Sequence, residues 1–174
     1  MAVNQERYQQ ILEELKPKNV QLVAVSKIQT VADIKLMYDL GQRDFGENYV
    51  QELVEKQALL PGNIRWHFIG HLQSNKVKYI APIVHLIQGV DSLKLLKEIS
   101  KQAKKAATIV NCLLQIHIAQ EETKFGLDAE ELAEIMELLQ NGEEQLLHVH
   151  VKGLMGMASF SNDVEKVRNE MKQL

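Results

Sequence analysis

Short, mostly apolar runs alternate along the chain with longer runs that place apolar residues at helical spacing. The first short run, QLVAVSK, contains four apolar residues in succession, which is typical of a strand that is covered on both faces. Runs of this kind predict strands at residues 21–27, 44–48, 64–70, 84–90, 108–118 and 147–159.

A helix is predicted after each of these strands, and one more precedes the first strand. Asn4, Thr30 and Asp91 stand where three of the helices begin and are expected to cap them. Pro17 and Gly41 mark two of the ends. The predicted helices cover residues 4–15, 30–40, 49–60, 74–81, 91–106, 127–140 and 161–174.

This strict alternation predicts one α/β domain with parallel strands and right-handed crossovers. A doubly wound open sheet and a (β/α) barrel both fit it. A full barrel needs eight units and roughly 250 residues, whereas the chain has 174. The G-x-G-x-x-G fingerprint of dinucleotide-binding open sheets is absent after the first strand. The alternation alone therefore leaves both architectures open.

Composition narrows the class of protein. The net charge of −3 and the scattered basic residues make no clustered basic face, so no nucleic-acid partner is expected. The single cysteine, Cys112, lies in an apolar run and is expected to be a core residue in a reducing compartment. No apolar segment approaches the roughly 20 residues that span a bilayer, and the first residues lack a signal core. A soluble, cytoplasmic protein without a membrane partner is expected.

Candidate chemistry collects where the strands end, because parallel α/β folds place their sites there. The first strand ends in Ser26-Lys27. Desolvation at that position would favour a neutral amine, which could form a Schiff base with a carbonyl compound. The alternative is a lysine that reaches water along its own stem, and from the residues alone this is the more common case.

The other strand ends are less specific. Glu47 and Asn48 could contact a ligand, or they could open a helix, with Asn48 as its cap. His67 and His71 are four apart but lie on and beyond a strand, so this spacing does not predict a metal site. His148 and His150 share a strand face without a third ligand nearby, and no metal is expected there either. Lys124, in the loop AQEETKFG, could bring a cation over the mouth or belong to an ordinary charged loop.

Six segments together resemble one known family. VAVSK, FGENYVQEL, WHFIGHLQSNK, GVDS, EETKFG and GLMGMAS follow the order of the pyridoxal phosphate homeostasis proteins. The resemblance implies an α/β fold, the TIM-type (β/α) barrel of the alanine racemase N-terminal domain. About six of its eight βα units are present, with an extra N-terminal helix. It also implies that Lys27 carries pyridoxal 5′-phosphate (PLP) as an aldimine, and that Asn48 and Ile69 line the cofactor.

The family resemblance implies a non-catalytic PLP carrier in vitamin B6 homeostasis, with no catalytic residue assigned. PLP-dependent apo-enzymes would be its recipients, and the protein would be a monomer or weak homodimer. Family members continue with two further βα units that hold the phosphate. Residues 1–174 are therefore expected to form a single, C-terminally truncated PLP-binding domain that retains PLP weakly. An amino-acid racemase and a cofactor-free Schiff-base aldolase using Lys27 are the alternatives.

Overall fold

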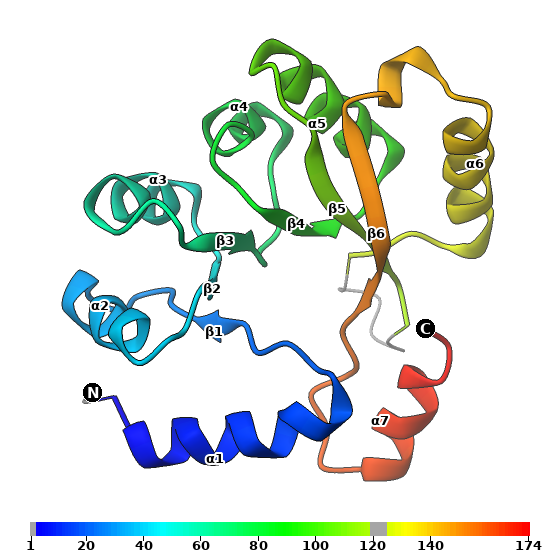
Figure 1. Ribbon diagram of the computed structural model, residues 1–174. Coiled ribbons are helices and arrows are strands. Elements are labelled where there is room, and N and C mark those ends of the chain that lie inside the picture. Colours follow the sequence, from blue (N-terminus) through cyan, green and yellow to red (C-terminus); the bar gives the residue numbers. More distant parts are fainter. Residues whose placement is uncertain (1–2, 119–124) are drawn as a thin grey trace.

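A computed structural model describes residues 3–118 and 125–174. Its strands form one parallel sheet in the order of the chain, β1-β2-β3-β4-β5-β6 (Figure 1). Parallel neighbours in chain order require every connecting helix to lie on the same side, as in a (β/α) barrel. The strands are β1 (Ala24–Val25), β2 (Asp44–Glu47), β3 (Arg65–Phe68), β4 (Leu86–Val90), β5 (Val110–Ile116) and β6 (Val149–Gly156).

The helices alternate with the strands, as predicted. In Figure 1, α2 to α6 lie around the outside of the curved sheet, while α1 and α7 lie across the side between β1 and β6. The helices are α1 (Gln5–Leu15), α2 (Val31–Asp39), α3 (Val50–Leu59), α4 (Val77–Ile80), α5 (Leu93–Lys105), α6 (Ala129–Gln140) and α7 (Val164–Met171). Short 3-10 turns are η1 (Lys16–Lys18), η2 (Ser74–Lys76) and η3 (Glu144–Leu146).

The strand order decides between the two architectures that the alternation left open. A doubly wound sheet reverses its strand order at a switch point, and this sheet does not. The expected barrel type with six strands is therefore confirmed. Within residues 3–118 and 125–174, β1 and β6 do not pair with each other, so the barrel is not closed.

The core fills the space between the sheet and its helices. Alternate residues of β2 and β3 face outward, and the Phe45 and Trp66 rings lie 6.1 Å apart, centroid to centroid. Phe68, Ile87 and Leu96 are fully buried in the same layer. These side chains belong to one hydrophobic cluster, whose buried members range in the sequence from Ile34 to Val149.

Two local expectations need correction. The first strand was expected to be covered on both faces, but β1 is only two residues long and Val25 is 55% exposed, because it lies at the sheet edge. Asp91 was expected to cap α5, but Ser92 is the cap, and its hydroxyl accepts from the Leu95 N–H. The caps Asn4 and Thr30 are confirmed. In the described part of the chain, no helix is both long and apolar enough to cross a membrane.

Candidate functional site

Lys27 lies in a tight turn that directly follows β1. The Gln29 N–H donates to the Ser26 carbonyl at 3.1 Å and closes a four-residue turn. Ile28, the third residue of that turn, has φ 66°, a left-handed conformation that is costly for a β-branched side chain. Lys27 itself is half-buried, and no hydrogen bond or ion pair links its ammonium to another described residue. The turn therefore presents a lysine without a partner.

Asn48 and Ile69 follow the next two strands, so all three predicted cofactor residues lie at neighbouring strand ends. Backbone hydrogen bonds of 2.9 Å join Ser26 N–H to the Gly46 carbonyl and Ile69 N–H to the Glu47 carbonyl. A Cβ atom on Gly70 would lie 2.7 Å from the Asn48 carbonyl oxygen, so this contact requires glycine. The parallel register brings the three residues together at the carboxyl ends of neighbouring strands.

A ligand contact and a helix start were both left open for Glu47 and Asn48, and the structure does not show the helix start. Glu47 is the last residue of β2 and is fully buried, whereas Tyr49 precedes α3 without any side-chain cap. The Glu47 carboxylate accepts from the Lys56 ammonium at 2.8 Å and from the Ser26 hydroxyl at 2.7 Å. It therefore joins β1 and β2 to α3.

The two lysines near the Ser26 turn differ in their hydrogen bonding. Lys56 donates to Glu47 at 2.8 Å, to Glu52 at 2.6 Å and to the Ser26 carbonyl at 2.8 Å, which uses all three of its hydrogens. The hydrogen bond from Lys56 is the main reason that the pKa of the Glu52 carboxyl is lowered. The Lys56 nitrogen is thus fully engaged by three oxygen atoms, whereas the Lys27 nitrogen has no such partner among the described residues.

A histidine–carboxylate pair also lies beyond the carboxyl ends of the strands, after β3 and β4. His71 Nδ1 is 3.0 Å from an Asp91 carboxylate oxygen, and the His71 ring stacks on Phe125 with centroids 4.2 Å apart. A cavity of about 600 Å³ beside this pair is lined by residues that include Asn48, His71 and Lys76. Lys124, the other predicted cation of this mouth, lies outside the described residues.

A second buried polar cluster lies at the opposite ends of β2 and β3. Asp44 accepts from Arg65 Nε at 2.7 Å and from His67 Nε2 at 3.0 Å. Burial would raise the pKa of the Asp44 carboxyl, but the hydrogen bonds from Arg65 and His67 outweigh burial and lower it to about 2. Burial lowers the pKa of His67, and its Nδ1 accepts from the Gln88 amide at 3.0 Å.

These groups resemble a metal site only in their spacing. The ligand atoms of Asp44, His67 and His85 lie within 4.8 Å of one another. However, Asp44 is already neutralised by Arg65, and both ring nitrogens of His67 are hydrogen bonded. A cation would have to displace these partners, so we regard the cluster as structural.

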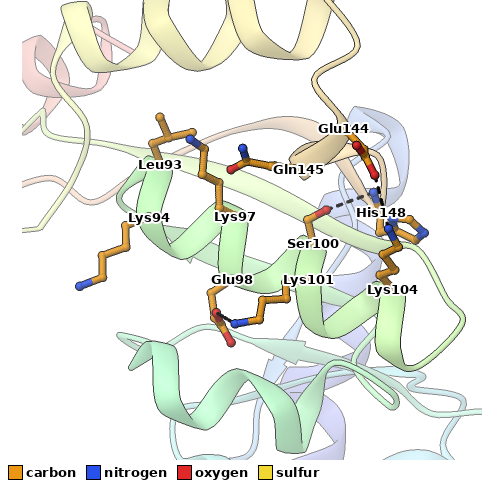
Figure 2. Close-up of a pocket in the computed structure, with 10 residues that line it drawn as sticks. All are labelled: Leu93, Lys94, Lys97, Glu98, Ser100, Lys101, Lys104, Glu144, Gln145 and His148. Carbon is orange, nitrogen blue, oxygen red and sulfur yellow. Dashed lines mark hydrogen bonds and ion pairs between the residues drawn. The ribbon is translucent and has the colours of Figure 1, made fainter.

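Two further candidates lie away from the predicted cofactor residues. Cys112 is fully buried, as expected, and burial raises the pKa of its thiol to about 12. A cavity of about 660 Å³ is a groove between α5 and the segment that precedes β6 (Figure 2). Of its lysines, Lys94, Lys101 and Lys104 are exposed and Lys97 is half-buried. Two of them pair with carboxylates, Lys101 with Glu98 and Lys104 with Glu144. Lys27, Asn48 and Ile69 do not line this groove.

No pattern in the sequence directly indicated the two buried clusters. Glu52 and Lys56 have the i, i+4 spacing of a helical ion pair, which was a readable signal. Their burial against Ser26 depends on α3 packing behind β1 and β2, which no local pattern shows. Asp44, Arg65 and His67 meet only through the register of β2 and β3.

Comparisons with known proteins identify related chains. Residues 3–174 match the family model described as alanine racemase, N-terminal domain. A pyridoxal phosphate homeostasis protein of Pasteurella multocida is 38% identical over 169 residues, covering 94% of this chain and 71% of the relative. The one from Schizosaccharomyces pombe is 36% identical over 155 residues, covering 88% of this chain. The chain spans 64% of the length of that relative.

Solved structures agree with these matches. PipY of Synechococcus elongatus without PLP superposes with a TM-score of 0.83 at 33% identity, covering 97% of this chain and 80% of PipY. PipY with PLP bound gives a TM-score of 0.78 at 32% identity, covering 97% of this chain and 82% of PipY. Alanine racemase from Bartonella henselae, at 17% identity and a TM-score of 0.69, covers 95% of this chain and 46% of the enzyme, and shows the shared fold.

Proposed function

Because the chain belongs to the pyridoxal phosphate homeostasis protein family, we propose that it binds PLP through an imine on Lys27 and acts in PLP homeostasis. The observation that carries this proposal is the difference between the two lysines near the Ser26 turn. Lys56 has all three hydrogens donated to oxygen atoms, whereas Lys27 has no hydrogen-bond partner among the described residues. Imine formation requires a lysine nitrogen that is free to approach the carbonyl carbon, and no described residue holds the Lys27 nitrogen.

The residues around Lys27 fit the aldehyde and ring of PLP. The Lys27 nitrogen, once it has lost its proton, adds to the aldehyde carbon, and loss of one water leaves a C=N bond. Asn48 has a side-chain amide that can donate to the ring substituents, and Ile69 offers an apolar surface. Asn48 follows β2, which pairs with β1, and Ile69 follows β3, which pairs with β2. When bound, PLP supplies an electron-accepting aldehyde and a phosphate group.

The test is an absorbance titration with PLP followed by borohydride reduction and peptide mapping. We expect an imine band near the visible edge and a reduced adduct on Lys27. Lys27→Ala should abolish both, while Lys76→Ala, which removes an exposed lysine from the neighbouring cavity, should keep them. An unchanged band in Lys27→Ala, or no band in the unaltered protein, would contradict the proposal.

We propose that the protein carries PLP and does not turn over amino acids efficiently. The His71–Asp91 pair favours the alternative of a racemase, because it could move a proton at the mouth. Nuclear magnetic resonance of amino acids in deuterated buffer separates the two. Loss of the α-proton faster than with free PLP, and its decrease in His71→Ala, would support an enzyme. Borohydride trapping with a keto compound and no PLP would instead support an aldolase.

Under this proposal, residues 1–174 act as a single PLP-binding unit in the cytoplasm, and PLP-dependent apo-enzymes receive the cofactor. The single continuous core supports one unit. Transfer can be followed by the recovery of activity in an apo-enzyme of this class mixed with the loaded protein. Light scattering would distinguish a monomer from a weak homodimer.

A further inference from the structure

The Lys27 turn is held in its strained shape by side chains from outside the turn. Ile28, next to Lys27, has φ 66°, and its side chain is 76% exposed, so side-chain packing does not explain this conformation. Its backbone N–H instead donates to the Glu52 carboxylate at 2.9 Å. A charge-assisted hydrogen bond to α3 therefore compensates for the strain.

The same carboxylate belongs to a buried network, which we call the turn clamp, formed by Ser26, Glu47, Glu52 and Lys56. Glu52 accepts from Lys56 at 2.6 Å, and Lys56 donates to the Ser26 carbonyl at 2.8 Å. The Ser26 hydroxyl donates to Glu47 at 2.7 Å. The clamp thus contacts the turn on both sides of Lys27, at Ser26 and at Ile28.

The charged side chains of the turn clamp are largely shielded from solvent. The Lys56 side chain is 9% exposed, Glu47 0% and Glu52 28%. Two carboxylates share one ammonium, and one oxygen of Glu47 has no hydrogen-bond partner within the described part of the chain. Partners of a buried charge resist displacement, because a charge left alone there is costly. The clamp therefore links α3 to the turn through hydrogen bonds that are costly to break.

We infer that Glu52 and Lys56 are positioning residues that set the orientation of Lys27 for imine formation, which rests on the proposed function. Neither side chain needs to touch PLP. Glu52 fixes the peptide that follows Lys27, and Lys56 fixes the peptide that precedes it. A turn that is fixed in this way loses less conformational freedom when the lysine becomes attached.

The experiment compares Glu52→Ala with Glu55→Ala on the same helix. Glu55 is exposed, and it contacts Gln51 on its own helix. In Glu52→Ala, we expect the Ile28 amide to exchange its hydrogen about tenfold faster, since a hydrogen bond to a charged group is lost. The equilibrium constant for imine formation should fall by about the same factor. Glu55→Ala should change neither quantity.

Glu52→Gln provides a rescue, because its amide oxygen can still accept from the Ile28 N–H. We expect it to restore most of the amide protection that Glu52→Ala loses, and with it most of the imine constant. Denaturant unfolding of each variant separates this local effect from a global loss of stability. Equal imine constants in Glu52→Ala and Glu55→Ala, with the Ile28 amide deprotected only in the former, would overturn the positioning role.

The proposed function and the positioning role fail in different ways. If the unaltered protein forms no imine with PLP, the proposed function fails, while amide exchange at Ile28 still reports on the turn clamp. If the imine forms on Lys27 but Ile28 is equally protected in Glu52→Ala and Glu55→Ala, the positioning role fails and the proposed function stands.

Discussion

The two ends of β2 each bury a carboxylate, and the two carboxylates are used differently. At the amino end, Asp44 meets Arg65 and His67, and every one of these groups is hydrogen bonded. At the carboxyl end, Glu47 meets Lys56 and Ser26, and the network holds a strained turn that leaves Lys27 unpartnered among the described residues. The first arrangement stabilises the fold, whereas the second holds the turn that contains Lys27, the residue proposed to form the imine.

This difference matches the division of labour in (β/α) barrels. Chemistry collects at the carboxyl ends of the strands, because the connecting loops there converge on one mouth, and the amino ends serve stability. Changes at the amino end should alter the free energy of unfolding, whereas changes at the carboxyl end should alter PLP imine formation.

The largest expected effect is on stability, at the amino end. Asp44→Ala leaves Arg65 and the buried His67 without their shared acceptor and should lower the free energy of unfolding by about 3 kcal/mol. Urea denaturation followed by circular dichroism measures this change. The folded fraction should still form the imine on Lys27. Loss of the imine in fully folded Asp44→Ala would show that the two ends are not independent.

The second-largest effect is expected in acid, where protonation of Asp44 should lower the free energy of unfolding. The pKa of Asp44 is lowered from 3.8 to about 2, so its contribution is complete above pH 4 and is lost as the pH falls through about 2. The loss should amount to about 2 kcal/mol. Unfolding free energies measured between pH 5 and pH 2 should fall more steeply in the unaltered protein than in Asp44→Asn. Parallel slopes would contradict the prediction.

The smallest expected effect on the free energy of unfolding comes from relieving backbone strain. Two residues with positive φ, Ile28 and Ala107, provide a matched pair for this test. Ile28 (φ 66°) follows β1, and Ala107 (φ 51°) precedes β5, at opposite ends of the sheet. Glycine at either position should raise the free energy of unfolding by about 1 kcal/mol at most, since strain relief is partly offset by unfolded-state entropy. Only Ile28→Gly should alter the imine constant. An equal imine constant in both variants would show that the conformation at Ile28 does not influence Lys27.

Much of the fold could be predicted from the sequence, because its signals are local. Apolar periodicity predicted the six strands and seven helices of the described residues, and Asn4 and Thr30 capped their helices as expected. The choice of a helix cap between two adjacent polar residues was harder to predict. Asp91 and Ser92 are both good capping residues, and in the structure Ser92 caps α5 while Asp91 contacts His71. The extent of β1 also depended on its edge position, which the residues alone do not reveal.

The sequence by itself determined the order of the elements and the family, and it placed Lys27, Asn48 and Ile69 at the ends of strands. The tertiary structure decided which charges meet. From the sequence, Glu47 and Asn48 could either contact a ligand or open a helix, because adjacent polar residues before an amphipathic run are common at helix starts. Only the packing of α3 behind β2 turned Glu47 into the partner of a buried lysine. Pairings between strands and helices depend on register and packing, which local patterns do not encode.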